Sequence, residues 1–241
     1  MNLSQAFENI VLRRRSNRRF DMNQPVPDEV IQRSLERAIL SPNSSNMQLW
    51  EFYWVQSPEE KSKYEKLCLG QSAARTASHL VVFVTRQDLW KSHAQWNIEK
   101  IKSSIQGEPS KSEKRALDYY RVLMPLLYRT DILGLSTLIR RAITLVKGFN
   151  NPFMRFAGLA DQRVMVHKSC ALAAQTFMLS IAAEGYDTCP MEGFDSKLVK
   201  RALQLPKGAE ITMIVAVGKG TEEGIYGKRN RLDFDEVVFK R

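Results

Sequence analysis

The sequence predicts a globular protein that mixes helices with strands, and three observations support that prediction. Residues 79–85 form a continuous apolar run of strand length, as a buried central strand does, and residues 210–217 predict a second buried strand. Several other stretches repeat apolar residues at helical spacing. Of the 241 residues, 44% are hydrophobic and 26% are charged, which is ordinary for a soluble protein with a full core. The length fits one large domain or two small ones.

The chain is basic, with a net charge of +10 and a pI near 9.6. This balance favours anionic partners such as nucleic acid, acidic lipid or phosphorylated ligands, but the basic residues are scattered rather than gathered in a tail. Three cysteines without CxxC spacing and three isolated histidines predict neither a disulfide framework nor a metal site. We find no signal-peptide core and no apolar run of the roughly 20 residues that a transmembrane helix needs. We therefore expect a cytoplasmic protein.

Apolar residues at helical spacing predict a first helix over residues 4–14, with Ser4 as its cap. Residues 13–20 then hold five arginines and Ser16. Such a stretch is typical of a solvated basic face, an arm that contacts nucleic-acid phosphates, or a nuclear-localisation signal. A compact anion site is the sharper interpretation, because the planar fork of arginine matches phosphate oxygens bidentately.

A second helix is predicted to begin at Pro27 and to end before Pro42. The loop that follows, 42–50, is dense in small amides and hydroxyls. It offers many hydrogen-bonding groups without net charge, which suits a heterocycle better than a metal ion or a phosphate. An ordinary polar turn is the alternative. Residues 51–55 then predict a strand and residues 58–67 a helix.

The pattern changes between residues 88 and 162, where the amphipathic, basic segment 119–147 stands out. It has the character of a lid over a ligand, of a helical excursion that packs on the core, or of a membrane-surface helix. Interruptions at Gly134, Gly148 and Pro152 favour the first two interpretations.

The stretch 166–183 is the most apolar helix of the chain, which predicts burial all round, inside a subunit or at a dimer interface. Residues 186–195 read as a turn whose Glu-Gly pair presents backbone N–H groups to a ligand, or as a plain connection. A helix over 196–204, the strand 210–217 and a strand-like tail at 233–239 complete the chain. The glycines after the last buried strand open no helix, so they form no dinucleotide-binding fingerprint.

Four segments together resemble the signatures of the FMN-dependent nitroreductase family. They are 14–20 (RRSNRRF), 41–50 (SPNSSNMQLW), 190–194 (PMEGF) and 229–231 (RNR). They follow the order of that family and cover nearly the whole chain. The resemblance implies an α+β fold with a central, mainly antiparallel sheet flanked by helices. It also implies one domain over 1–241 with a helical lid or insertion at about 88–162, in an intertwined homodimer with an exchanged C-terminal arm.

The resemblance also implies the residues of two FMN sites at the subunit interface. Arg14, Ser16 and Arg18 match residues that hold the phosphate, the ribityl chain and the ring edge, and Arg229 and Arg231 match a second basic pair on the phosphate. The partner chain would line the ring, and the backbone of a Glu-Gly turn would approach the flavin N5. The complete set of expected cofactor-binding residues is Arg14, Arg15, Ser16, Arg18, Pro42, Asn43, Ser44, Asn46, Pro190, Met191, Glu192, Gly193, Arg229 and Arg231.

The sequence departs from the family pattern in two places. Compact members place an Asn and a Lys against the flavin pyrimidine, and the matching positions here are Gly70 and Ala73. Arg75 and Lys168 are the candidate replacements for that lysine. The segment 88–162 is longer than in compact members, and in the family this region covers the flavin and selects the substrate.

The resemblance implies a flavoenzyme that takes hydride from NAD(P)H and reduces an acceptor such as a nitroaromatic or a quinone in a ping-pong cycle. No side chain need act as nucleophile or general acid, because the flavin carries the chemistry; Arg18 is the candidate substrate contact. The alternatives are a specialised member, such as a reductive dehalogenase or a flavin-processing enzyme, and a basic protein that binds nucleic acid or a membrane surface. We expect no nucleic-acid partner.

Overall fold

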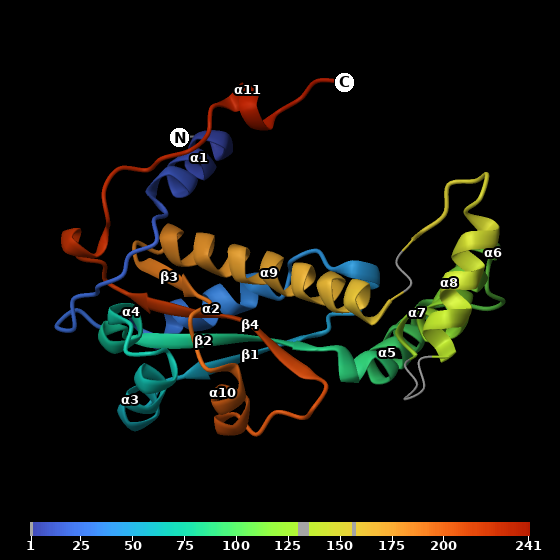
Figure 1. Ribbon diagram of the computed structural model, residues 1–241, viewed down its shortest axis with the longest axis horizontal. Helices are drawn as coiled ribbons and strands as arrows, with labels where there is room; N and C mark the ends of the chain where they lie inside the picture. Colours follow the sequence, from blue (N-terminus) through green and yellow to red (C-terminus); the bar gives the residue numbers. More distant parts are fainter. Residues whose placement is uncertain (1, 130–134, 156–157) are drawn as a thin grey trace.

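A four-stranded antiparallel sheet forms the centre of the computed structural model, which describes residues 2–129, 135–155 and 158–241 (Figure 1). Its strands are β1 (Trp50–Val55), β2 (His79–Arg86), β3 (Asp187–Met191) and β4 (Ala209–Gly218). They lie in the order β1-β2-β4-β3, and each neighbouring pair is antiparallel. The predicted α+β fold with an antiparallel sheet is confirmed.

Helices cover both faces of the sheet. The long helix α9 (Leu159–Ala183) and α2 (Asp28–Ala38) pack on one face. On the other face lie α3 (Pro58–Leu67), α4 (Ser72–Thr76) and α10 (Ser196–Ala202). Because both faces are covered, the middle of each central strand is apolar at successive positions, over 80–84 in β2 and 213–217 in β4.

The side chains of the central strands divide between the two faces. Val81 and Phe83 join the cluster under α9, whereas Leu80, Val82 and Val84 join the cluster with α3, α4 and α10. This alternation is the period of two that a strand imposes. Each fully buried side chain of this size stabilises the fold by about 1.5–3 kcal/mol relative to exposure, so the strands fix the core.

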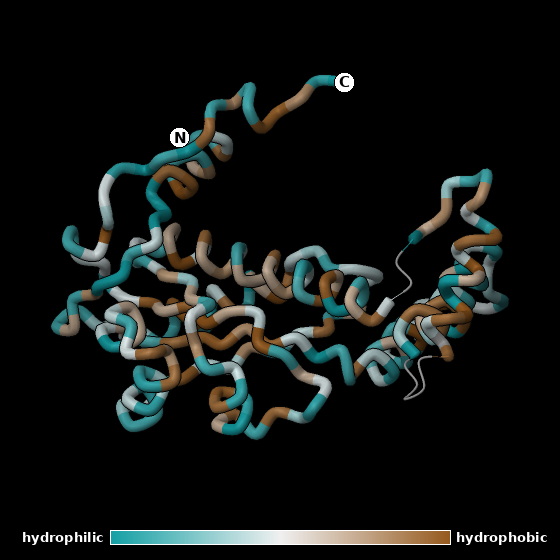
Figure 2. The backbone as a smooth tube through the Cα atoms, in the orientation of Figure 1, coloured by the Kyte–Doolittle hydropathy of each residue, from teal (hydrophilic) through white to brown (hydrophobic). Residues whose placement is uncertain are grey.

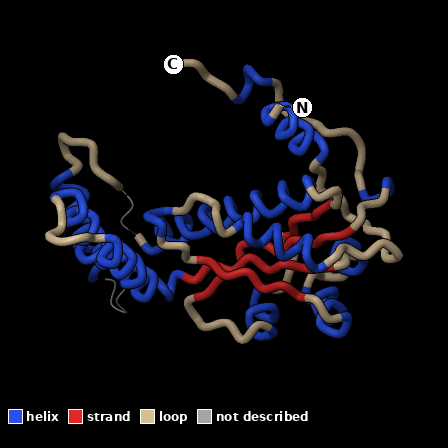
Figure 3. The backbone as a smooth tube through the Cα atoms, turned by 180° about the vertical axis from the view of Figure 1, so that it is seen from behind, coloured by secondary structure: helices blue, strands red, loops and turns tan. Residues whose placement is uncertain are grey.

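The segment after β2 forms a helical group at one end of the sheet (Figures 1 and 3). It contains η2 (Gln87–Leu89), α5 (Trp90–Ser104), α6 (Lys111–Asp118), a π-helical turn η3 (Tyr119–Leu123), α7 (Met124–Tyr128) and α8 (Leu135–Lys147). A third apolar cluster, which includes Met47, Met124 and Val166, joins this group to the main body. Gly134, one of the predicted interruptions, lies outside the described residues.

The N-terminal helix and the C-terminal segment run side by side, above the end of α9 near β3 and apart from the sheet (Figure 1). The first helix, α1 (Leu3–Arg13), has no buried residue, and Asn2 rather than Ser4 is its cap. The hydropathy colouring shows apolar residues on α1 and on the C-terminal segment that face no neighbouring layer (Figure 2). Phe7 is 58% exposed and Phe239 is 69% exposed.

Three predicted elements are corrected by the structure. The tail is not a strand: residues Phe234–Val237 form the short helix α11, because Asp233 and Glu236 cap it reciprocally. The stretch 186–195 is not only a turn, because its first half pairs with β4 as the edge strand β3. The apolar helix begins at Leu159, and within the chain it is not buried all round, since Val164 and Leu172 are about half exposed.

One helix in the described part of the chain, α9, is long and apolar enough to cross a membrane. Half of its most apolar window is buried inside the fold, however. Its buried residues pack on β2 and β4. Helix α9 is therefore the core helix of this protein.

His79 gives the fold an acid-sensitive point. Its Nε2 lies 2.8 Å from the Val26 carbonyl oxygen, and its Nδ1 accepts from the Trp54 indole N–H at 3.2 Å, which suits a neutral ring. Burial lowers the pKa of His79, despite the opposing effects of the Val26 carbonyl and the Asp28 carboxylate. A lowered folded-state pKa means that the unfolded chain takes up a proton first as pH falls below the ordinary histidine value.

We expect the free energy of unfolding to fall between pH 7 and pH 5, and to fall less in a His79→Gln variant. Urea titrations of both proteins at several pH values measure this difference. An identical pH dependence in the two proteins would contradict the assignment.

Candidate cofactor site

The N-terminal arginine segment is fixed against the end of the sheet by its backbone. Ser16 forms a parallel bridge with Thr188 of β3, and the Asn17 N–H donates to the Thr188 carbonyl at 3.0 Å. The side chain of Asn17 is 2% exposed and donates to the Thr221 carbonyl at 2.9 Å. The Arg18 N–H donates to the carbonyl of Gly224, in η4 (Glu222–Gly224), at 2.8 Å. Asn17 therefore joins the segment to both the sheet and the C-terminal region.

Four arginines meet where the two ends of the chain come together. Burial lowers the pKa of Arg14, and the charges of Arg229, Arg231 and Arg15 lower it further. None of the ion pairs found in the described ranges involves any of these four side chains. The cluster is therefore a concentration of positive charge that an anion would relieve.

The arginines of the cluster differ in their own contacts. The guanidinium of Arg229 donates to the carbonyls of Leu12 at 2.9 Å and Arg14 at 2.6 Å, so it caps the end of α1. Arg15 donates to the Gly227 carbonyl at 3.0 Å. Arg14 makes no side-chain hydrogen bond to any residue that the structure describes, and it is only half-buried. Arg14 is thus the member of the cluster best able to turn toward a ligand.

Arg18 lies beside the edge strand. Its guanidinium carbon stands 4.8 Å from the centre of the Tyr226 ring, a cation–π contact. Burial raises the pKa of the Cys189 thiol, and the charge of Arg18 partly opposes that effect. Arg18 is exposed, so it faces the surface next to β3.

Arg13 and Arg19 also have partners. Arg13 donates to the Ala182 carbonyl at 2.7 Å at the end of α9, and Arg19 pairs with Glu223. These two arginines attach the segment to the rest of the protein and are not members of the cluster.

The edge strand β3 separates the arginine segment from the predicted Glu-Gly turn. Ser16 bridges Thr188 near the start of β3; Pro190 and the buried Met191 end it. Gly193 lies five residues beyond Thr188, or about 17 Å at the rise of an extended chain. The basic cluster and the turn therefore lie at opposite ends of one strand.

Gln71, at the cap position of α4, is a residue of this region that the sequence analysis did not assign. Its amide nitrogen donates to the Gly193 carbonyl at 2.5 Å. Ala73, the position matched to the family's lysine, is 2% exposed in the core and does not reach the site. Arg75 in the same helix is exposed. No local signal marks Gln71, because only the fold brings it to the turn.

A cavity of about 590 Å³ adjoins the turn, between α9 and β4. Its lining includes Glu192, Phe194, His167, Lys168 and Arg163. One candidate for the missing lysine, Lys168, thus lies in the same cavity as Glu192.

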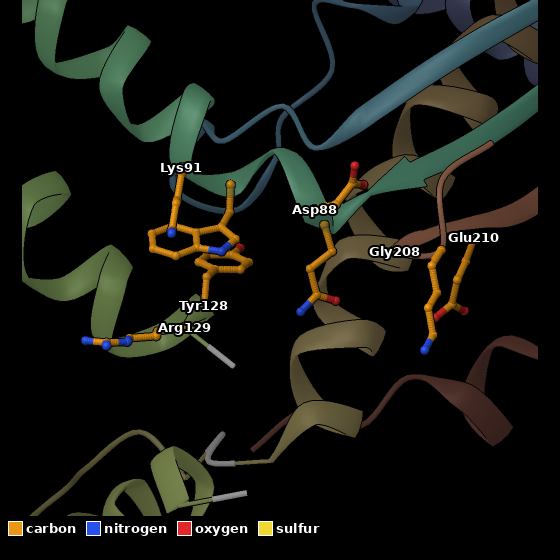
Figure 4. Close-up of a pocket in the computed structure, with 9 residues that line it drawn as sticks. Asp88, Lys91, Tyr128, Arg129, Gly208 and Glu210 are labelled. Atoms are coloured by element: carbon orange, nitrogen blue, oxygen red, sulfur yellow. The ribbon is translucent and has the colours of Figure 1, made fainter. Parts of the chain in front are cut away.

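A second cavity of about 550 Å³ lies at the root of the helical group (Figure 4). Lys91, Tyr128 and Arg129 form one wall, and Gly208 and Glu210 the other. The Tyr128 ring stacks on Trp90 with centroids 6.3 Å apart.

Glu210 lies at the boundary of the two cavities. Burial raises its pKa, but hydrogen bonds from Arg163 and His167 outweigh burial and leave the pKa below its ordinary value. Glu210 therefore stays ionised and holds two side chains that line the cavity beside the turn.

The polar loop is held against the opposite half of α9. It contains Pro42, Asn43 and the short helix η1 (Ser44–Asn46). The Ser44 N–H donates to Ser169 Oγ at 3.2 Å, whereas Arg13 contacts the carbonyl of Ala182. Thirteen helical residues separate these contacts, or about 20 Å along the axis.

One chain thus brings together Arg14, Arg15, Ser16, Arg18, Arg229 and Arg231, and the strand β3 connects them to Pro190, Met191, Glu192 and Gly193. It does not bring the loop residues Pro42, Asn43, Ser44 and Asn46 to the arginines.

Comparison with known proteins agrees with the fold. Residues 11–219 match the model of the nitroreductase family. The chain is 28% identical over 230 residues to a Thermus thermophilus protein named NADH dehydrogenase, covering 95% of this chain and 93% of that protein. It is 25% identical over 234 residues to Bacillus subtilis MhqN, described as an NAD(P)H nitroreductase, with 96% and 97% covered.

Solved structures share the same architecture. A Bacillus subtilis protein described as the nitroreductase YdfN superposes with a TM-score of 0.76 at 22% identity, over 99% of this chain and 100% of that one. A protein from Exiguobacterium sibiricum, described as a nitroreductase in complex with FMN, gives 0.67 at 23% identity, with 98% and 97% covered. The chain belongs to the nitroreductase family and is an NAD(P)H oxidoreductase of that family.

Proposed function

We propose that this protein is a homodimeric flavoenzyme that holds FMN between its subunits and passes electrons from NAD(P)H to an acceptor such as a nitroaromatic or a quinone. The observation that carries the proposal is the cluster of Arg14, Arg15, Arg229 and Arg231. Burial and the charges of the other three arginines lower the pKa of Arg14, and none of the four has a carboxylate partner among the ion pairs of the described residues. A phosphate dianion fits this cluster. The Exiguobacterium relative, which has the same fold, was solved with FMN.

The direction of β3 matches the shape of the cofactor. The phosphate and the ring of FMN lie at opposite ends of its ribityl chain. In the same way, the arginines and the Glu192–Gly193 turn lie at opposite ends of β3. In this arrangement Arg14 and Arg231 hold the phosphate, and Ser16 contacts the ribityl chain. Arg18 lies at the ring edge, where it also meets the substrate. The Gly193 carbonyl is held by Gln71, which orients the turn so that its N–H faces the ring.

Bound FMN would supply the redox chemistry, accepting hydride at N5 and then reducing the second substrate in a ping-pong cycle. The protein contributes position and charge. A positive group near the ring and an N–H at N5 favour the reduced, anionic form of the flavin. Arg18 is the first candidate for that positive group, and Lys168 and Arg75 are the others.

A second copy of the chain would complete the site. Within one chain the polar loop lies about 20 Å from the arginine segment along α9. The half-exposed Leu172 on α9, the unburied helix α1 and the exposed Phe239 supply the apolar surface that such a partner would cover. In the dimer, Pro42, Asn43, Ser44 and Asn46 of one chain line the ring held by the other. Residues 88–162 form the lid of a single domain.

The proposal is tested first by colour. We expect protein purified without added flavin to be yellow, to absorb in the flavin bands and to bleach under anaerobic NAD(P)H. Colourless protein that takes up no FMN would refute it. A steady-state screen of nitroaromatics and quinones with each nicotinamide then identifies the substrates.

Removal of the C-terminal arm tests the dimer. A variant that ends at residue 231 keeps the four arginines of the cluster but loses the exposed apolar residues Phe234, Val237 and Phe239. If the arm embraces the partner, its loss should raise the dimer dissociation constant by more than about tenfold, since each buried aromatic side chain contributes about 1.5–3 kcal/mol. Light scattering over a dilution series measures this. An unchanged dimer would show that the arm is not exchanged.

A further inference from the structure

The predicted ring-lining loop has a strained backbone. Ser45, Asn46 and Gln48 adopt φ angles of 56°, 48° and 49°. This left-handed region is unfavourable for residues with a Cβ atom, and three such residues within four positions are unusual. A conformation of this kind persists only where surrounding contacts impose it.

Asn43 within the loop and Ser169 of α9 hold part of this conformation, and the contacts to Ser45 and Asn46 come from the helical group at the end of the sheet. The Tyr119 hydroxyl lies 2.6 Å from Ser45 Oγ, and the Tyr120 hydroxyl donates to the Ser45 carbonyl at 2.9 Å. Asn97 of α5 donates to the Asn46 carbonyl at 3.1 Å. The residues that make these bonds lie between 51 and 75 positions further along the chain than their partners in the loop. Each bond is made to Ser45 or Asn46, within the strained segment.

The two tyrosines reach the same residue because of the π-helical turn η3. Consecutive residues on a regular α-helix do not share a face. The π-turn spans Tyr119–Leu123 and allows both hydroxyls to meet Ser45, while the two rings pack edge to face at 5.4 Å. Single π-turns inside α-helices are frequent at functional sites. The loop and the helical group therefore form one connected unit.

We propose that Tyr119 and Tyr120 are positioning residues that hold loop 43–48 in the strained conformation needed to line the flavin ring. Through them, the helical group controls how tightly FMN is bound and how easily it is reduced. This inference rests on the proposed function, because it takes the loop to be part of the FMN site. Neither tyrosine need touch the cofactor: each acts through Ser45.

The test uses the full-length dimer and the single variants Tyr120→Phe and Tyr119→Phe. Losing the bond to the Ser45 carbonyl should let the loop relax, and we expect the FMN dissociation constant to rise about tenfold in Tyr120→Phe and about threefold in Tyr119→Phe. The reduction potential of bound FMN should fall, because the relaxed loop presents fewer donors to the reduced ring. In flavin-free protein, amide hydrogen exchange of residues 44–48 should accelerate.

Two controls separate positioning from general stability. Tyr53→Phe removes a hydroxyl that donates to Glu51 on β1, at 2.7 Å, and should change neither FMN affinity nor potential. Gln48→Gly, added to Tyr120→Phe, should restore part of the affinity, because glycine adopts a φ of 49° without steric cost. A tyrosine that only packs the helical group would not be rescued in this way.

Each outcome decides the matter. Weaker FMN binding and a shifted potential, with a melting temperature within about 4 °C of the original, support the proposal. Unchanged affinity and potential overturn it, and so does affinity that falls only in step with thermal stability. If the original protein itself binds no FMN, the proposed function fails, an outcome distinct from a flavoprotein whose tyrosine variants behave normally.

Discussion

Replacing Arg14 with glutamine is expected to weaken FMN binding by about 10- to 100-fold while leaving the flavin-free protein at least as stable as before. The affinity falls because a charge-assisted hydrogen bond to phosphate contributes about 1.5–3 kcal/mol, and each 1.4 kcal/mol is tenfold in the dissociation constant. The stability does not fall, because Arg14 is partly buried beside Arg229, Arg231 and Arg15, and burial together with those charges lowers its pKa. Its removal relieves electrostatic repulsion among the arginines of the flavin-free protein.

Arg229→Gln supplies the contrast. This arginine donates to the carbonyls of Leu12 and Arg14 at the end of α1, so its loss should lower the stability of the flavin-free protein as well as the affinity. Arg201 is an exposed arginine on α10, and Arg201→Gln should change neither quantity. Fluorescence titration with FMN and thermal unfolding of flavin-free protein measure both effects.

The different effects of Arg14→Gln and Arg229→Gln on the stability of the flavin-free protein make this prediction specific. A solvated basic face predicts small and equal effects for all three variants. Full flavin content in Arg14→Gln would remove Arg14 from the phosphate site. A loss of stability as large as that of Arg229→Gln would show that the cluster is a structural feature of the fold.

The sequence predicts the central strands well, because strands buried on both faces are marked by apolar stretches that can be recognised without knowing their neighbours. It misses β3, whose residues Asp187–Met191 include Pro190 and form no apolar run. An edge strand of this kind is set by its pairing with β4 and by the bridge from Ser16, contacts between residues far apart in the sequence.

The prediction of a strand in the C-terminal tail fails for a related reason. Alternating apolar residues become a strand only beside another strand, and without one the local Asp233–Glu236 cap produces a helix.

The functional site is predictable to a similar extent. The motif containing Arg14 and the one containing Arg231 can be read from the sequence because they are short and rich in one residue type. That they meet in space depends on contacts between distant residues, such as Asn17 with Thr221 and Arg229 with the Arg14 carbonyl, which no local pattern indicates. Gln71 is not found because nothing near it in the sequence indicates that it will contact Gly193. Contacts made by the fold rather than by local pattern are the part that the sequence does not show.

Gly224→Ala tests whether the close packing at Asn17 holds the site together. A Cβ atom at Gly224 would lie 1.8 Å from Asn17 Oδ1 and 2.6 Å from the Arg19 backbone nitrogen. A side-chain atom can move away, but the backbone of the arginine segment cannot move without breaking the Arg18–Gly224 hydrogen bond. We expect the free energy of unfolding to fall by about 3 kcal/mol, the upper end for overpacking. The melting temperature should fall by about 6–12 °C.

Alanine substitutions at two other glycines should have smaller effects on stability than Gly224→Ala. For a Cβ atom at Gly220 the three nearest atoms would all belong to side chains, with Asn17 Nδ2 at 2.2 Å, so Gly220→Ala should destabilise the protein less. At Gly158 the nearest atom would be the Asp161 carboxylate at 3.4 Å, an ordinary contact, and Gly158→Ala should change stability by less than about 1 kcal/mol. FMN affinity should follow the order Gly158→Ala, Gly220→Ala, Gly224→Ala, from least to most weakened, because the same displacement moves Arg14 and Arg18. If Gly224→Ala lost stability but bound FMN normally, the arginine segment would not be part of the cofactor site, since the clash at Arg19 cannot be relieved without moving it.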